Sequence, residues 1–249
     1  MNQPPIMTVT NLKKSFKTTQ VLKGVNFSVQ KGEVFALLGS NGAGKTTTIK
    51  ILSTLMQQYE GTVQIGGVDL AKNPRKVREL ISLTGQFAAL DLTLSARANM
   101  RTICELRGIK NYDSKIDELL TRFSLTDVQD KKVETYSGGM KRRLDIAMSL
   151  LGEPQIIFLD EPTTGIDPQN RIAMWEIIKT LAGQGVTIFL TTQYLEEAEA
   201  LADTVAILDK GIITDIDTVQ GLKEKHGQDT LENVFLSIVN NDNGGQLNA

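Results

Sequence analysis

The first residues that could do chemistry form a glycine-rich segment that ends in a lysine and two threonines. The segment fits the pattern GxxxxGK[ST] and consists of Gly39, Ser40, Asn41, Gly42, Ala43, Gly44, Lys45, Thr46 and the following Thr47. Glycines let a backbone turn its N–H groups toward a phosphate, which the N-terminus of a following helix also attracts. In such a loop the lysine reaches the β- and γ-phosphates, and the threonine hydroxyl holds Mg²⁺. A plain glycine-rich turn is the alternative, but the apolar run before the loop and the helical pattern after it favour a nucleotide site.

Two adjacent acids, Asp160 and Glu161, follow a second apolar run, IIFL. If this run is a buried parallel strand, it delivers both carboxylates to the sheet edge where the phosphate loop lies. There Asp160 would help to hold Mg²⁺, and Glu161 would polarise the water that attacks the nucleotide. The alternative is a strand that ends in a helix N-cap, for which acidic residues are also favoured. The phosphate loop favours catalysis, although alone it is compatible with a kinase, a GTPase or a recombinase.

A second candidate anion site is the turn formed by Ser137, Gly138 and Gly139. Backbone N–H groups at the positive end of a helix attract phosphate, and two glycines leave them accessible. Lys141, Arg142 and Arg143 follow directly. The alternative is an ordinary helix, capped by serine and carrying a basic face exposed to solvent.

Alternating strands and helices are expected to position these three segments. Alternating or continuous apolar runs predict strands over 7–12, 21–29, 33–39, 62–70, 155–160, 186–192 and 204–209, and helical spacing begins at Thr46 and recurs over 172–181 and 194–202. Between about 95 and 151 the pattern is helical only, with the last helix starting near Met140. We therefore predict an α/β fold whose parallel sheet has right-handed crossovers, preceded by an antiparallel β part and interrupted by an all-helical insertion.

The composition fits a packed globular chain and excludes several kinds of site. The chain has 249 residues, is 41% hydrophobic and 22% charged, and carries a net charge of −2, which favours neither nucleic acid nor an acidic membrane as partner. Cys104 is the only cysteine and His226 the only histidine, so neither an internal disulfide nor a multi-histidine metal site can form. Cys104 is expected in the core and His226 in solvent. No secretory signal and no run of the roughly 18–20 apolar residues that span a bilayer is evident, so we expect a membrane role to require another chain.

The order of these motifs resembles that of the ATP-binding subunits of ABC transporters. The resemblance rests on the phosphate loop, on SGG before a basic helix and on FLDEP, and it covers about residues 6–240. It implies a P-loop NTPase (RecA-like) core over about 1–86 and 155–215, a helical subdomain over about 87–154, and a C-terminal extension over about 216–249. It also implies that Ser137, Gly138 and Gly139 contact ATP held by Lys45 of a second copy.

Four further residues acquire roles only from this resemblance. Phe16 matches an aromatic residue that stacks on adenine, with a core phenylalanine as the alternative. Gln86, in SLTGQF, matches a glutamine that touches Mg²⁺ and reports the nucleotide state to the membrane partner; the alternative is a polar residue at a strand end. Asp167, in TTGIDP, matches an aspartate that links two copies, or is a turn aspartate before proline. Gln193 stands where the family usually has a histidine that contacts the γ-phosphate, and its amide can donate a hydrogen bond but cannot carry a proton.

The segments TGQ, YSGGMKRRLDIA and TTQYLEEAEALAD together resemble the subgroup related to daunorubicin-resistance ATP-binding proteins, in which this glutamine is characteristic. By that resemblance we expect a Mg²⁺-dependent ATPase at the cytoplasmic face of the membrane. It would form an ATP-dependent homodimer and power export of drugs, antibiotics or lipophilic compounds through a separate transmembrane permease, with no nucleic acid partner. Two alternatives stay open: a nucleotide sensor with little turnover, suggested by Gln193, and a soluble ABC protein acting on ribosomes or DNA, which a single phosphate loop disfavours.

Overall fold

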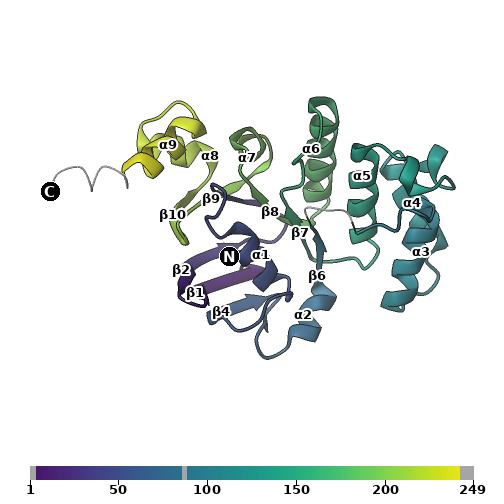
Figure 1. The fold of residues 1–249 in the computed structure, drawn as a ribbon, viewed down its shortest axis with the longest axis horizontal. Helices are drawn as coiled ribbons and strands as arrows, with labels where there is room; N and C mark the ends of the chain where they lie inside the picture. Colours follow the sequence, from purple (N-terminus) through teal and green to yellow (C-terminus); the bar gives the residue numbers. More distant parts are fainter. Residues whose placement is uncertain (1–3, 86–88, 242–249) are drawn as a thin grey trace.

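Two β-sheets lie at the centre of the molecule in the computed structural model, which describes residues 4–85 and 89–241 (Figure 1). The smaller sheet has the strand order β2-β1-β4-β5, and its neighbouring strands are antiparallel. Its strands are β1 (Met7–Phe16), β2 (Thr19–Val29), β4 (Glu60–Ile65) and β5 (Val68–Asp69). This confirms the predicted antiparallel β part. The single strand predicted over 62–70 is wrong, because Gly66 and Gly67 adopt left-handed φ angles of 56° and 73° and turn the chain into the β4–β5 hairpin.

The larger sheet has the strand order β10-β9-β3-β8-β7-β6. Its strands are β3 (Val34–Leu38), β6 (Ile81–Thr84), β7 (Ile156–Asp160), β8 (Thr187–Thr192), β9 (Thr204–Asp209) and β10 (Ile212–Asp217). All neighbouring pairs are parallel except β9 and β10. The carboxyl ends of β3, β7 and β8 therefore meet at one edge, as the sequence predicts for the phosphate loop and the two acids.

Helices cover both faces of the larger sheet. They are α1 (Lys45–Leu52), α2 (Pro74–Leu80), α3 (Ala96–Arg107), α4 (Asp113–Arg122), α5 (Gly138–Ser149), α6 (Pro168–Gly183), α7 (Leu195–Leu201), α8 (Val219–His226) and α9 (Leu231–Asn241). Helices α3, α4 and α5 all come between β6 and β7 in the chain and gather at one end of the molecule (Figure 1). Helices α8 and α9 lie at the opposite end (Figure 1).

The alternation of residues along the buried strands divides the apolar interior into two cores. On β3, Phe35 and Leu37 face the core that contains α1 and the smaller sheet, whereas Val34, Ala36 and Leu38 face the core that contains α5, α6 and α7. A strand buried on both faces reads as a continuous apolar run, which is why its period of two is invisible in the sequence.

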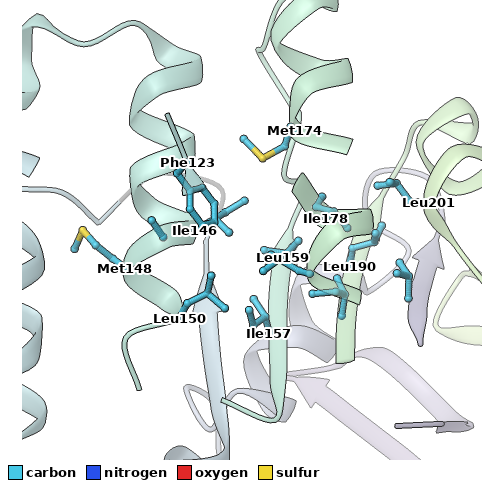
Figure 2. Packing of buried hydrophobic residues seen from close by; sticks show 14 of the residues in the cluster. Phe123, Ile146, Met148, Leu150, Ile157, Leu159, Met174, Ile178, Leu190 and Leu201 are labelled. Atoms are coloured by element: carbon cyan, nitrogen blue, oxygen red, sulfur yellow. The ribbon is translucent and has the colours of Figure 1, made fainter. Parts of the chain in front are cut away.

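Apolar contacts join α5, the last helix of the helical insertion, to the larger sheet. Figure 2 shows Ile146 of α5 and Leu150, directly after the end of α5, beside Ile157 and Leu159 of β7. Ile178 of α6 lies on the same face of the sheet (Figure 2). The α5 helix is therefore held against the strand that carries the two candidate catalytic acids.

The predicted burial is confirmed for Cys104, whereas the predicted exposure is wrong for His226. Cys104 is fully buried on α3, as predicted. The expectation that His226 is solvated is wrong: its side chain is only 25% exposed, and its Nε2 lies 2.7 Å from Oδ2 of the buried Asp215. The charged stretch around His226 obscures this contact, which forms only when α8 folds back on β10.

No helix within residues 4–85 and 89–241 combines the length and the apolar character needed to cross a membrane.

Phe189 tests the packing of the core beneath the smaller sheet. Its ring is fully buried and lies 5.3 Å from Phe35, 5.5 Å from Phe158 and 5.7 Å from Phe27, centroid to centroid. We expect Phe189→Ala to lower the free energy of unfolding by about 3–5 kcal/mol, because it removes apolar contacts and leaves a cavity. Urea unfolding followed by circular dichroism measures this loss. Phe189→Leu, the control, should cost clearly less; equal stability of the alanine variant and the wild type would contradict this account of the core.

Candidate active site

The phosphate loop leaves β3 at Gly39 and enters α1 at Lys45. Gly39 donates its N–H to the carbonyl oxygen of Thr192 on β8 at 3.2 Å, and a Cβ at Gly39 would lie 2.4 Å from the carbonyl oxygen of Leu208. Gly42 and Gly44 adopt φ angles of 83° and 114°. Only glycine meets these requirements without strain. The loop therefore folds tightly over the N-terminus of α1, the geometry in which backbone N–H groups bind an anion.

Lys45 is buried in this loop and held by three oxygen atoms. Its Nζ donates to the carbonyl oxygens of Gly39 at 2.8 Å and Ser40 at 3.1 Å, and lies 3.5 Å from Oε1 of Glu161. Burial lowers the pKa of Lys45, and the negative charge of Glu161 opposes that change. An ammonium with oxygen partners on several sides is ready to exchange one of them for a phosphate oxygen. Thr46, the candidate Mg²⁺ ligand, is exposed beside it, and Thr47 is partly exposed.

The two acids lie at the carboxyl end of β7, and β8 holds both of them. Asp160 is 8% exposed, and its Oδ1 accepts a hydrogen bond of 2.6 Å from the Thr191 hydroxyl. The N–H of Glu161 donates to the carbonyl oxygen and the hydroxyl oxygen of the same Thr191, at 3.1 and 3.2 Å. Oε2 of Glu161 accepts from the Thr164 hydroxyl at 3.3 Å. The N-cap alternative for these acids is wrong, because α6 begins only at Pro168 and Asp167 caps it.

The serine-glycine turn forms the N-terminus of α5. Oγ of Ser137 accepts a hydrogen bond of 3.2 Å from the N–H of Met140, and Ser137 and Gly138 are exposed. A Cβ at Gly139 would lie 2.5 Å from Oδ1 of Asn170, so the turn packs against the start of α6. Asn170 also donates to both carboxylate oxygens of Asp167, at 3.1 and 2.7 Å. Asn170, which the sequence analysis did not single out, thus joins the turn to Asp167.

One chain brings together only part of the predicted site. Gly39, Lys45, Asp160 and Glu161 meet at one sheet edge, whereas α5 lies beyond β7 from α1 (Figure 1). The proposal that residues 141–143 form a solvated face is wrong for its middle member: Arg142 is 6% exposed. No sequence signal distinguishes Arg142 from its basic neighbours, because its burial depends on where α5 packs.

The remaining predicted residues lie around this edge. Phe16, at the end of β1, is 44% exposed, and Nζ of Lys14 lies 5.2 Å from its ring centroid, so the core alternative for Phe16 is wrong. Gln193 directly follows β8, next to Thr192, whose carbonyl oxygen binds the phosphate loop, and is partly exposed. Gln86 falls outside the described residues.

Comparison with known proteins agrees with this geometry. The family model described as ABC transporter matches residues 22–164, more than half of the chain, from β2 to the segment after Glu161. The chain belongs to the ABC transporter family. It has the P-loop NTPase fold of that family's ATP-binding subunits and is an ATPase.

Several relatives of this ABC transporter subunit cover nearly all of its length. Daunorubicin resistance ATP-binding protein DrrA3 of Streptomyces coeruleorubidus is 43% identical over 98% of this chain and 76% of the relative. Doxorubicin resistance ATP-binding protein DrrA of Mycobacterium tuberculosis H37Rv is 42% identical over 97% of this chain and 72% of the relative. Linearmycin resistance ATP-binding protein LnrL of Bacillus subtilis 168 is 38% identical over 92% of this chain and 75% of the relative.

Solved structures share the fold of the subunit. The structure of an ATP-binding subunit of an ABC transporter superposes with a TM-score of 0.84 at 29% identity, over 94% of this chain and 99% of the other. The dimeric structure of the ATP-binding cassette MJ0796, in a post-hydrolysis state bound to ADP and Pi, has a TM-score of 0.75 at 24% identity, over 85% and 98%.

Gly39 tests the tight fold of the phosphate loop. In Gly39→Ala the new Cβ would collide with the backbone of β9, so we expect a lower melting temperature and weaker ATP binding. Thermal unfolding and titration with a fluorescent ATP analogue measure the two effects. Gly138→Ala is the matched control for stability, because nothing lies within 4 Å of its Cβ. Unchanged melting and unchanged ATP affinity in Gly39→Ala would contradict the described loop.

Proposed function

We propose that two copies of this subunit close around two Mg-ATP molecules and thereby power export through a separate membrane-spanning permease. The observation that carries the proposal is the 3.5 Å approach of Lys45 to Glu161 at the sheet edge, while Ser137 and Gly138 remain exposed elsewhere on the same chain. One copy thus contains the Lys45 side of the proposed ATP site. The serine-glycine turn faces outward, which supports a role for it in contacting the ATP of a second copy.

The oxygen donors near the loop suit Mg²⁺, which prefers hydroxyl, carboxylate, amide and phosphate oxygens and is usually bound by only a few protein groups. Thr46, Asp160 and Gln86 are the residues that would hold it. When bound, Mg²⁺ offsets the charge of the β- and γ-phosphates.

Hydrolysis then needs a base and a positive charge on opposite sides of the γ-phosphate. A phosphate oxygen that replaces Glu161 beside Lys45 leaves the Glu161 carboxylate free to accept a proton from water. The water oxygen forms the new bond to the γ-phosphorus, the bond to the β–γ bridging oxygen breaks, and ADP and phosphate leave. Gln193, at the end of β8, donates a hydrogen bond to the γ-phosphate but supplies no proton. Phe16 offers its exposed ring to the adenine.

The second copy supplies Ser137, Gly138 and Gly139 to the same ATP. Backbone N–H groups at the start of α5 suit this role, because a helix N-terminus attracts negative charge. Asp167 lies beside that turn through Asn170 and would face the partner copy as well. The dimeric MJ0796 cassette, bound to ADP and Pi, supports a paired arrangement for this fold.

The names of the relatives support the direction and class of transport. Proteins 38–43% identical to this chain confer resistance to daunorubicin, doxorubicin or linearmycin, which favours export of drugs, antibiotics or lipophilic compounds. The division into a core (about 1–86 and 155–215), a helical subdomain (about 87–154) and a C-terminal extension (about 216–249) belongs to the same proposal. So does a location at the cytoplasmic face of the membrane, where the helical subdomain transmits ATP binding to the permease.

Glu161 tests the chemistry. We expect Glu161→Gln to keep ATP affinity within about threefold and to lower kcat by about a hundredfold or more, because a glutamine amide cannot accept the proton from water. Phosphate release from the wild type and the variant, measured with permease-containing membranes, compares the two rates, and drug efflux in cells should fall with them. Normal efflux with the variant would contradict the proposal. Equal, near-zero rates in both proteins would instead favour a nucleotide sensor, the second candidate, which Gln193 suggests.

Mixing two inactive variants tests whether the site is shared. Lys45→Ala removes the lysine, and Ser137→Arg blocks the exposed turn, so each variant alone should hydrolyse little ATP. In a mixed dimer one of the two sites combines an intact Lys45 with an intact Ser137, so the mixture should recover up to about a quarter of wild-type activity. A mixture no more active than its components would contradict a site built from two copies.

A further inference from the structure

Arg142 occupies an unusual position for a residue in a basic surface stretch. It extends from α5 to the carboxyl ends of the paired strands β6 and β7, and only 6% of it is exposed. Its Nε donates to the carbonyl oxygen of Pro162 at 3.0 Å, and one Nη donates to that of Gly85 at 2.5 Å. The other Nη lies 3.5 Å from the carbonyl oxygen of Asp160. A single guanidinium therefore contacts the backbone on both sides of Glu161 and the residue directly before Gln86.

The backbone at Glu161 is strained and needs support from its surroundings. Glu161 has a φ angle of 47°, in the left-handed region, which is unfavourable for a non-glycine residue. Such a conformation persists only when several contacts hold it. Thr191 holds the N–H of Glu161 from the side of β8. Arg142 holds the flanking carbonyl groups from the side of α5, so the turn is fixed from two directions.

The charge of Arg142 is balanced within the same region. Oδ2 of the buried Asp145 lies 3.4 Å from its Nη1, and burial raises the pKa of Asp145 to about 6, although Arg142 opposes this rise. Glu197, fully buried on α7, also attracts Arg142 electrostatically and binds the Thr163 hydroxyl at 2.7 Å. Burial lowers the pKa of Arg142, but a guanidinium stays charged in proteins.

A planar guanidinium holds five donors in a rigid fork and can reach carbonyl groups on several sides, whereas a lysine ammonium is a compact point charge on a flexible stem and cannot span the same set. We propose that Arg142 is a positioning residue for ATP hydrolysis: it clamps the carbonyl groups of Asp160 and Pro162 and thereby aims the Glu161 carboxylate at the reacting phosphate. Its contact to Gly85 ties the same clamp to the segment that leads to Gln86. The inference rests on the proposed role of Glu161 as the base.

Arg142→Lys is the informative variant, because it keeps a positive charge beside Asp145 and so leaves no unpaired buried charge. We expect it to lower kcat by about tenfold or more, since small errors in the position of a reacting group cost large factors in rate, while KM for ATP changes less than about threefold. Steady-state ATPase assays of the full-length chain with its permease give both constants, and thermal unfolding shows that the variant is folded at the assay temperature.

Asp145→Asn is the matched control. It removes one negative charge but keeps an oxygen that can accept hydrogen bonds from Arg142 and from the Ala89 N–H, and Glu197 still offsets the charge of Arg142, so kcat should stay within about threefold of wild type. Introducing Arg142→Lys into the Glu161→Gln variant should lower the residual rate no further, because Arg142 acts through Glu161. Wild-type kcat in Arg142→Lys, an equal loss in Asp145→Asn, or an additive loss in the double variant would overturn the proposal. Wild-type turnover in Glu161→Gln alone would overturn the proposed base instead, independently of the Arg142 results.

Discussion

The contact between Lys45 and Glu161 depends on where three parallel strands end. β3 leads into the phosphate loop, β7 ends at Asp160, and β8 lies between them and binds both. The carbonyl oxygen of Thr192 accepts a hydrogen bond from the N–H of Gly39. Thr191 donates a hydrogen bond to the Asp160 carboxylate and accepts one from the N–H of Glu161. The distance between lysine and carboxylate is therefore set by the spacing and register of backbone ladders, which are stiffer than side chains. Every proposed step of the chemistry relies on the distance that this strand register sets between Lys45 and Glu161.

A second constraint acts through α5. The same helix presents the exposed serine-glycine turn at its N-terminus and the buried Arg142 one turn later. A movement of α5 would thus displace both the turn that we propose contacts the ATP of a second copy and the Arg142 side chain that supports the Glu161 turn. This gives a physical reason why closure of a dimer and alignment of the base could occur together.

The sequence predicts best those features that local chemistry determines. The phosphate loop, the strand before Asp160 and the helix after Ser137 follow from glycine spacing, apolar runs and capping residues. The pattern does not indicate α2, β10, α8 or α9, which are short or mixed in polarity and depend on tertiary packing. The β4–β5 hairpin was hidden because its turn, Gly66 and Gly67, interrupts an otherwise continuous strand pattern. Arg142, Asn170 and His226 were misjudged or missed for a related reason: their partners are 20, 31 and 11 positions away, on other elements.

The central claim is that ATP is held between the Lys45 loop of one copy and the Ser137 turn of another. A structure of the Glu161→Gln variant with Mg-ATP tests it most directly. The account predicts a symmetric dimer in which backbone N–H groups of the serine-glycine turn lie within hydrogen-bonding distance of the triphosphate bound by the other copy. A nucleotide-bound structure in which that turn faces solvent in every assembly would contradict it.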